Sequence, residues 1–178
     1  MIIDMPSGRQ TFDYDCGAKA LQLVLAYYGF DIREDLLIKE LATSDEYGTL
    51  ARNMAALAKK KGFQVIVKTG MSLKTLKRHI DNKRPVIVLV QAWADKYMTI
   101  QDWKTVNEHG HYVVVIGYQA NKIIFEDPSS FPRTWMTQRE FLARWHYTDV
   151  RTQEKKDHFA MVLMGKEPLL TARMEHMD

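Results

Sequence analysis

A β-hairpin is predicted by the stretch GHYVVVIGYQANKIIFEDP, which covers residues 110–128. Two runs of β-branched and aromatic residues, 112–118 and 123–125, are separated by a short polar turn. His111 stands at the head of the first run and Asp127 at the tail of the second. Because the start of one hairpin strand lies beside the end of its partner, we expect His111 and Asp127 to be cross-strand neighbours. A carboxylate in that place can hold the imidazole in one tautomer.

The rest of the chain places helices before strands. Residues 18–28 carry apolar side chains on one helical face, and residues 33–42 and 49–61 continue this pattern. The later runs 86–90 and 160–164 are apolar, as expected for buried strands. This order is typical of an α+β domain, with N-terminal helices packed on a mostly antiparallel sheet. The remaining predicted elements are a strand at 63–68, a helix at 72–80 capped by Ser72, and a short helix at 137–145.

Length and composition indicate one folded domain. The chain has 178 residues, of which 46% are apolar, enough to build a core. We expect a single domain over residues 1–165 and a polar C-terminal tail over residues 166–178. Lys and Arg total 25 and Asp and Glu total 22, so the net charge of 25 − 22 = +3 is too small to indicate a nucleic-acid partner.

Three absences in the sequence narrow the class of protein further. A basic n-region followed by a long apolar stretch is missing at the start, and the longest apolar runs are too short to span a membrane. The single cysteine precludes an internal disulfide and a zinc site of several thiolates. We therefore expect a cytoplasmic protein without a membrane span, a cofactor or a metal. The sequence leaves the oligomeric state open.

The single cysteine, Cys16, stands where a helix is predicted to begin. The first N–H groups of a helix are unpaired and carry partial positive charge, which favours a thiolate. A lone cysteine is more often a buried apolar residue than a nucleophile. A nucleophilic thiol, however, needs a base to take its proton and a third group to orient that base. His111 and Asp127 meet both needs, so we predict a nucleophilic role for Cys16.

The order of these residues resembles the papain-like bacteriocin-processing cysteine peptidases. Those enzymes cut leader peptides after a double-glycine site, usually as a domain fused to an ABC transporter. No transporter segment is visible in this sequence, so we expect a stand-alone member. The resemblance covers roughly residues 10–141 and is carried by an ordered set of motifs. These are Gln10 six residues before Cys16, DCG at 15–17, GHYVVVIGY at 110–118, Asp127-Pro128, Gly48-Thr49 and Pro85.

The resemblance implies a papain-like α+β fold and a role for each site residue. Cys16 would be the nucleophile of a cysteine peptidase, and His111 its general base and later its general acid. Asp127 would orient His111. The side-chain amide of Gln10 and the backbone N–H of Cys16 would form the oxyanion hole. The expected partner is a peptide or protein substrate.

Three points stay open at this stage. The segment 91–110 holds Trp93 and has no clear period, so it is either a flap that contacts substrate or a local hairpin that packs its own aromatic residues. His109 could join His111, Asp127 and Cys16 in a metal site, although nucleophilic catalysis explains the free thiol better. The same fold could also bind peptides without turnover, or transfer the acyl group to an amine.

A fourth point concerns Asp15, which precedes the thiol directly. Its charge would oppose ionisation of Cys16 unless the carboxylate turns toward backbone N–H groups. An aspartate at this position is a common helix N-cap, and its presence in the family motif favours that interpretation. We therefore expect Asp15 to cap the helix.

Overall fold

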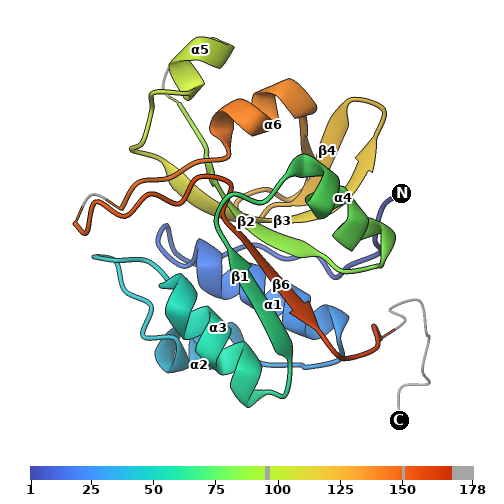
Figure 1. The fold of residues 1–178 in the computed structure, drawn as a ribbon. Coiled ribbons are helices and arrows are strands. Elements are labelled where there is room, and N and C mark those ends of the chain that lie inside the picture. The colour runs from blue at the N-terminus through green and yellow to red at the C-terminus, as the bar shows by residue number, and fades with distance from the viewer. Residues whose placement is uncertain (95–96, 150, 170–178) are drawn as a thin grey trace.

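An antiparallel sheet of six strands is the centre of the computed structural model, which describes residues 1–94, 97–149 and 151–169 (Figure 1). The strands lie in the order β1-β6-β2-β3-β4-β5, and all neighbours are antiparallel. Strand β2 is buried along its whole length, in agreement with its apolar sequence. The strands are β1 (Gln64–Lys68), β2 (Val86–Gln91), β3 (Gly110–Gln119), β4 (Lys122–Glu126), β5 (Thr134–Thr137) and β6 (Ala160–Met164).

Helices cover both faces of this sheet. The three N-terminal helices gather on one side, where Gly17 of the first helix meets Tyr112 of β3. Helix α6 covers the other side, where the rings of Phe125 and Phe141 lie 5.7 Å apart (Figure 1). The helices are α1 (Cys16–Tyr27), α2 (Glu34–Glu40), α3 (Ala51–Lys60), α4 (Leu73–Asp81), α5 (Ile100–Trp103) and α6 (Gln138–Arg144). The predicted α+β class, helices on a mostly antiparallel sheet, is confirmed.

The predicted hairpin is present, and two short elements were not predicted. Strands β3 and β4 are joined by Ala120 and Asn121, with Ala120 in the left-handed region at φ 49°. The Ser72 hydroxyl accepts a hydrogen bond from the N–H of Thr75, as expected of an N-cap. Helix α5 lies inside the segment without clear period, and β5 is a four-residue edge strand. Both are too short to give a periodic signal in the sequence.

The first turn of α1 is wedged between α3 and the sheet. A Cβ atom on Gly17 would lie 2.7 Å from Cβ of Thr49 and 3.0 Å from a ring carbon of Tyr112, so this close approach requires glycine. Thr49, just before α3, accepts a hydrogen bond on its hydroxyl oxygen from the N–H of Ala18 at 3.1 Å. Its hydroxyl also bonds that of Thr43 at 2.9 Å. A residue far away in the sequence therefore caps α1 in place of a local side chain.

The described start of the predicted tail lies against the helical layer. The Lys166 ammonium lies 5.2 Å from the ring centre of Phe30 and 5.4 Å from that of Phe63. The N–H of Leu169 donates to the carbonyl of Tyr27 at the end of α1. The rest of the tail, residues 170–178, lies outside the described residues, so the boundary at residue 165 stays a prediction. None of the helices in the described ranges is long and apolar enough to cross a membrane.

The cap from Thr49 is testable by substitution. Thr49→Val removes the hydroxyl but keeps the shape, which leaves the buried N–H of Ala18 without an acceptor. We expect the free energy of unfolding to fall by about 1–2 kcal/mol, the usual cost of a lost N-cap. Urea unfolding followed by circular dichroism measures this change. Thr49→Ser keeps the hydroxyl and is expected to lose less, and equal losses in the two variants would contradict the capping role.

Candidate active site

His111 and Asp127 form a buried pair at one end of the sheet. Nε2 of His111 lies 2.8 Å from Oδ1 of Asp127. The His111 side chain is 1% exposed and that of Asp127 15% exposed. Asp127 also accepts hydrogen bonds from the N–H and hydroxyl of Ser129 at 2.9 and 2.8 Å and from the Thr134 hydroxyl at 3.3 Å. These donors fix the carboxylate, and the carboxylate fixes the ring.

The hairpin register explains how the two residues meet. Val114 pairs with Glu126, and the register shifts at a bulge between Val115 and Gly117. Asp127 follows the last residue of β4, so it reaches His111 diagonally from beyond the strand end. The two residues are therefore neighbours across the hairpin, as predicted, although they are not directly opposite one another.

The pair shifts both pKa values in the direction of an ion pair. Burial alone would lower the pKa of His111, but its hydrogen bonds and charge interactions with Asp127 and Cys16 raise the pKa to about 9. Burial alone would raise the pKa of Asp127, but the hydrogen bond and charge of His111, with the donors of Ser129, lower it to about 2. His111 is therefore protonated and Asp127 ionised at neutral pH.

Cys16 is the first residue of α1 and lies beside His111. The thiol contributes to the raised pKa of His111 through its hydrogen bond and its charge. Nδ1 of His111 is buried and, among the described residues, has no partner that meets strict hydrogen-bond geometry. Because Nε2 is occupied by Asp127, Nδ1 is the ring nitrogen available to the thiol. The N–H groups of Cys16 and Gly17 stand at the open end of α1.

Asp15 does not cap α1 in the way the sequence suggested. Its two carboxylate oxygens accept hydrogen bonds from the N–H groups of Thr11 and Phe12, in the loop before the helix. The α1 cap comes from Thr49 instead. Burial raises the pKa of Asp15, which the N–H of Phe12 partly offsets. Asp15 thus stabilises the loop that leads into Cys16 rather than the helix itself.

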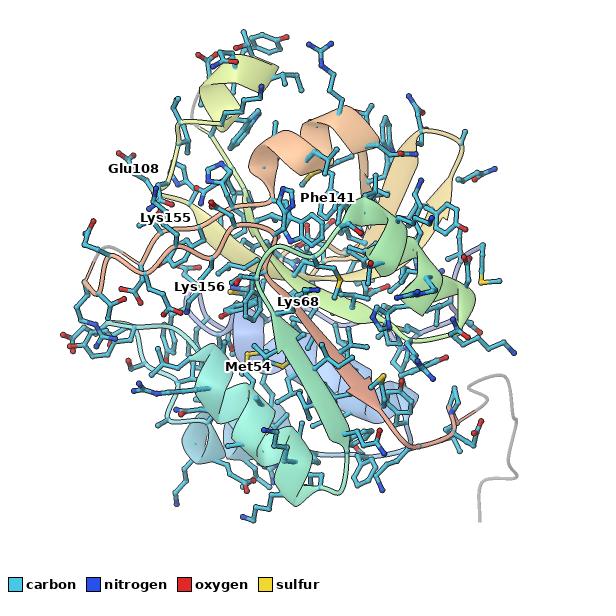
Figure 2. The ribbon with its side chains drawn as sticks, viewed as in Figure 1. Met54, Lys68, Glu108, Phe141, Lys155 and Lys156 are labelled. Carbon is cyan, nitrogen blue, oxygen red and sulfur yellow. The ribbon has the colours of Figure 1, made fainter. Side chains whose placement is uncertain are left out.

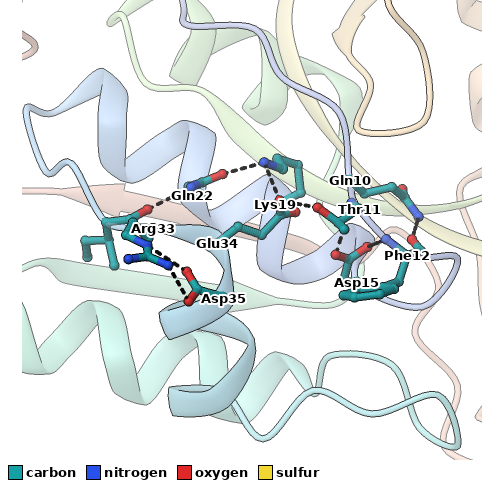
Figure 3. Close-up of polar contacts among 10 residues, drawn as sticks. Gln10, Thr11, Phe12, Asp15, Lys19, Gln22, Arg33, Glu34 and Asp35 are labelled. Atoms are coloured by element: carbon teal, nitrogen blue, oxygen red, sulfur yellow. Dashed lines mark hydrogen bonds and ion pairs between the residues drawn. The ribbon is translucent and has the colours of Figure 1, made fainter.

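Gln10 lies in the same loop, beside Thr11, which binds Glu34 of α2 (Figure 3). Its N–H donates to the carbonyl of Pro128 at 2.8 Å. Its side-chain Nε2 donates to the carbonyl of Phe12 at 2.6 Å, while its Oε1 is buried and finds no partner among the described residues. One amide hydrogen remains for another acceptor. The hydroxyl of Thr11 donates to Glu34 of α2 at 2.8 Å.

The segment 91–110 contributes an aromatic ring to the site. The Trp93 ring centre lies 4.3 Å from that of His111, and the tryptophan is 50% exposed. Its backbone has φ 50°, a conformation that side chains of this size rarely adopt. Trp103, in contrast, is buried beneath the guanidinium of Arg144, which lies 4.0 Å from the ring centre. The segment therefore both packs its own aromatics and touches the candidate base; residues 95–96 lie outside the described part.

His109 does not join His111. It precedes β3, and its backbone is held by the side chain of Gln91 at 3.1 Å and the N–H of Ala92 at 2.8 Å. Within the described ranges, no group of three or more His, Cys, Asp and Glu side chains could hold a metal ion. The alternative metal site from the sequence is therefore not assembled by these residues.

Cys16 and His111 each line a cavity. Successive residues of a strand point to opposite faces, so His111 and Tyr112 enter different hollows. His111 lines a small cavity of about 180 Å³ together with Asp127, Trp93 and the buried face of β4. Tyr112 lines a cleft of about 500 Å³ together with Cys16. Cys16 and His111 thus line different cavities.

Comparison with known proteins gives a family match over most of the chain. The model of the Peptidase_C39 like family matches residues 2–152. No curated protein matches the sequence.

Solved structures show the same architecture. The peptidase domain of Streptococcus ComA, a bifunctional ABC transporter involved in quorum sensing, is 26% identical with a TM-score of 0.65, and the match covers 90% of this chain and 97% of that one. A structure from Bacillus anthracis named as a C39-like peptidase has 19% identity and a TM-score of 0.70, covering 93% and 98%. A double glycine motif protease from an AMS/PCAT transporter, solved with its leader peptide, has 18% identity and a TM-score of 0.62, covering 91% and 92%. The papain-like peptidase fold inferred from the motifs is confirmed.

The His111–Asp127 pair predicts a titration that can be observed directly. In the Asp127→Asn protein the carboxylate charge is lost while burial and the effect of Cys16 remain, so the pKa of His111 should fall from about 9. NMR titration of the imidazole resonances measures this shift. His79 is an internal control, because burial and two arginines rather than Asp127 lower its pKa. An unchanged His111 titration would contradict the pairing.

Proposed function

Because the chain belongs to the Peptidase_C39 like family, we propose that it is a cysteine peptidase in which Cys16, His111 and Asp127 act as a catalytic triad. The observation that carries this proposal is how the two nitrogens of the His111 imidazole are placed and protonated. Asp127 holds Nε2 at 2.8 Å, and the buried Nδ1 is left for the thiol of Cys16. A raised pKa of His111 keeps an imidazolium beside Cys16 at neutral pH, where it can stabilise the thiolate that attacks the substrate.

Acylation begins with attack by the thiolate of Cys16 on the carbonyl carbon of the peptide bond. A carbon–sulfur bond forms, and the carbonyl oxygen becomes an oxyanion. When this intermediate collapses, the carbon–nitrogen bond breaks and Nδ1–H of His111 donates its proton to the leaving amine. Asp127 stays ionised throughout and stabilises the imidazolium.

Deacylation restores the enzyme by the same groups in reverse. Neutral His111 takes a proton from water, whose oxygen attacks the thioester carbonyl. The carbon–sulfur bond breaks, a carboxylic acid product leaves, and Cys16 is again a thiolate beside an imidazolium. Trp93, whose ring lies 4.3 Å from that of His111, limits access of bulk water to one face of the imidazole.

The oxyanion is stabilised by donors from the start of α1 and from Gln10. The N–H of Cys16 is at the positive end of the helix, where the first donors are unpaired. The Gln10 amide donates one hydrogen to Phe12 and keeps the other for the oxyanion. A neutral amide stabilises the oxyanion without neutralising the thiolate.

The substrate we propose is a peptide or protein segment cut at a defined site, in the manner of leader-peptide processing. The support is the likeness to a double glycine motif protease solved with its leader peptide. A precursor peptide with two glycines ahead of the cleaved bond is the first substrate to test. Replacement of either glycine by leucine should abolish cleavage if the proposal is right, and cleavage at unrelated sites would contradict it.

Loss of the nucleophile gives the first prediction on activity. Cys16→Ala should abolish hydrolysis of any peptide that the wild-type protein cuts, and His111→Ala should slow alkylation of Cys16 by iodoacetamide at pH 7, because no imidazolium remains to stabilise the thiolate. Product release is followed by mass spectrometry, and alkylation by the mass of the intact protein. Full hydrolytic activity in Cys16→Ala would rule out the proposal.

The role of Gln10 can be separated from a structural role. Gln10→Ala should lower kcat by about 10²–10³, the usual loss when one oxyanion donor is removed. Alkylation by iodoacetamide forms no oxyanion, so its rate at Cys16 should stay at the wild-type value. Parallel measurement of kcat and the alkylation rate gives both numbers. A matching fall in both rates would mean that Gln10 acts on the fold of the loop instead.

The pKa of His111 sets the alkaline limit of activity. The imidazolium exists below its pKa and is lost above it, and the pKa of His111 is raised to about 9. We therefore expect kcat/KM to stay high through neutral pH and to fall as pH rises through about 9. Initial rates across this range, with protein stability checked at each pH, provide the test. A fall already near pH 6.5 would mean that Asp127 does not support the imidazolium.

A further inference from the structure

The cleft that holds Cys16 has a charge opposite to that of the whole chain. Five carboxylates line it and only two basic side chains, Arg151 and Lys156, whereas the full chain carries a net charge of +3. Glu108 and Lys156 lie on the same side of the molecule (Figure 2). The carboxylates come from four separate segments, which makes the acidity a property of the cleft: Asp13, Asp45, Glu46, Glu108 and Asp149.

The two cations of the cleft already face groups of the chain itself. Hydrogen bonds from the N–H groups of Thr152 and Arg151, and the charges of Arg151 and Lys156, lower the pKa of Asp149. The Lys156 ammonium lies 3.7 Å from the carboxylate of Glu154. The guanidinium of Arg151 lies 4.5 Å from the ring centre of Tyr47, on the opposite wall of the cleft. The contact of Arg151 with Tyr47 is thus an example, within the chain itself, of a cation bound by an aromatic ring of this cleft.

Unpartnered phenol groups lie at the floor of the same cleft. Tyr112 is 7% exposed, and its hydroxyl forms no hydrogen bond with another residue in the described part of the chain. Burial raises the pKa of Tyr112, and so do the charges of Cys16, Tyr147 and Asp149. Burial and Asp149 also raise the pKa of Tyr147. Both tyrosines line the same cleft as Asp149, and their hydroxyls stay neutral donors and acceptors.

The chemistry of the cleaved bond decides which part of a substrate enters this cleft. The leaving amine receives its proton from His111, so the segment after the cleaved bond must leave along the His111 side. The acyl part stays attached to Cys16, which lines the cleft together with Tyr112. The acidic cleft therefore faces the segment ahead of the cleaved bond.

We propose that this cleft selects peptides with a lysine or arginine side chain ahead of the two glycines that precede the cleaved bond, bound by Asp149 and the hydroxyls of Tyr112 and Tyr147. This inference rests on the proposed peptidase function. Asp149 is the partly buried carboxylate of the set, so its charge is screened less by salt than those of the exposed acids at the rim. The tyrosine rings add favourable contact with a cation.

The charge of the cleft can be measured without turnover. Cys16 is reacted with the cationic reagent trimethylammonium-ethyl methanethiosulfonate and with its anionic sulfonatoethyl analogue, each of which forms a mixed disulfide and releases a sulfinate. The cationic reagent should react faster at low salt, and Asp149→Asn should reduce the ratio of the two rates by about threefold. Asparagine still accepts from the N–H groups of Arg151 and Thr152, so only the charge is removed.

A matched control separates local from overall charge. Asp31 is exposed and lies beyond the far end of α1, which spans about 18 Å at 1.5 Å per residue. Asp31→Asn removes the same charge from the chain and should leave the ratio at its wild-type value. Equal ratios in wild type and Asp149→Asn, or equal losses in the two variants, would overturn the inference.

Substrate selection is tested with internally quenched peptides that keep the two glycines and differ only in Lys, Gln or Glu at the positions ahead of them. We expect kcat/KM to rank Lys above Gln above Glu at one of these positions, and Asp149→Asn to shrink the ratio of Lys to Glu. Hydrolysis that depends on Cys16 but ignores charge would overturn this inference and leave the peptidase function standing. Absence of hydrolysis that depends on Cys16 would overturn the peptidase function, and the reagent ratio would still decide the charge of the cleft.

Discussion

The close packing of the first turn of α1 between Thr49 and Tyr112 is the constraint on which the candidate site depends. Gly17 has no room for a side chain because Thr49 and Tyr112 press against it from two sides. Tyr112 follows His111 in β3. The contact of Tyr112 with Gly17 at the start of α1 therefore also sets the position of Cys16 relative to His111. Thr49 adds the helix cap, which couples the start of α3 to the same point. A loss of this packing would move the nucleophile and the base apart, even though neither is substituted.

Burial of His111 and Asp127 destabilises the fold unless both side chains are charged and hydrogen-bonded. An isolated imidazole in this place would lose its proton, and an isolated carboxylate would gain one. The 2.8 Å contact reverses both tendencies, and Ser129 and Thr134 satisfy the remaining lone pairs of the carboxylate. A buried ion pair with its hydrogen bonds complete can persist, whereas a half-satisfied one is strongly destabilising. Asp127 is thus a structural requirement for the charged form of His111.

The sequence predicted the features that depend on local patterning. Alternation and the short turn placed His111 beside Asp127, and the helix boundary placed Cys16 at a helix start, because both signals lie within a few residues. It could not show that Thr49 caps α1, since that partner is far away in the chain. For the same reason Asp15 was assigned to the helix, whereas the N–H groups of Thr11 and Phe12 bind its carboxylate. The contact of Trp93 with His111 also depends on tertiary packing, although the aromatic, aperiodic segment that contains it was a usable signal.

Because successive side chains of β3 point to opposite faces of the sheet, the site has two cavities of different size. His111 points into one hollow and Tyr112, one residue later, into the other, so a single strand supplies the base to the first and the floor to the second. The walls of the larger cleft come mainly from the loops around residues 45–49 and 147–156, which hold none of Cys16, His111 and Asp127. Loops on a rigid scaffold tolerate change better than the strands that carry them. Charge and shape in this cleft can therefore vary without disturbing the His111–Asp127 pair.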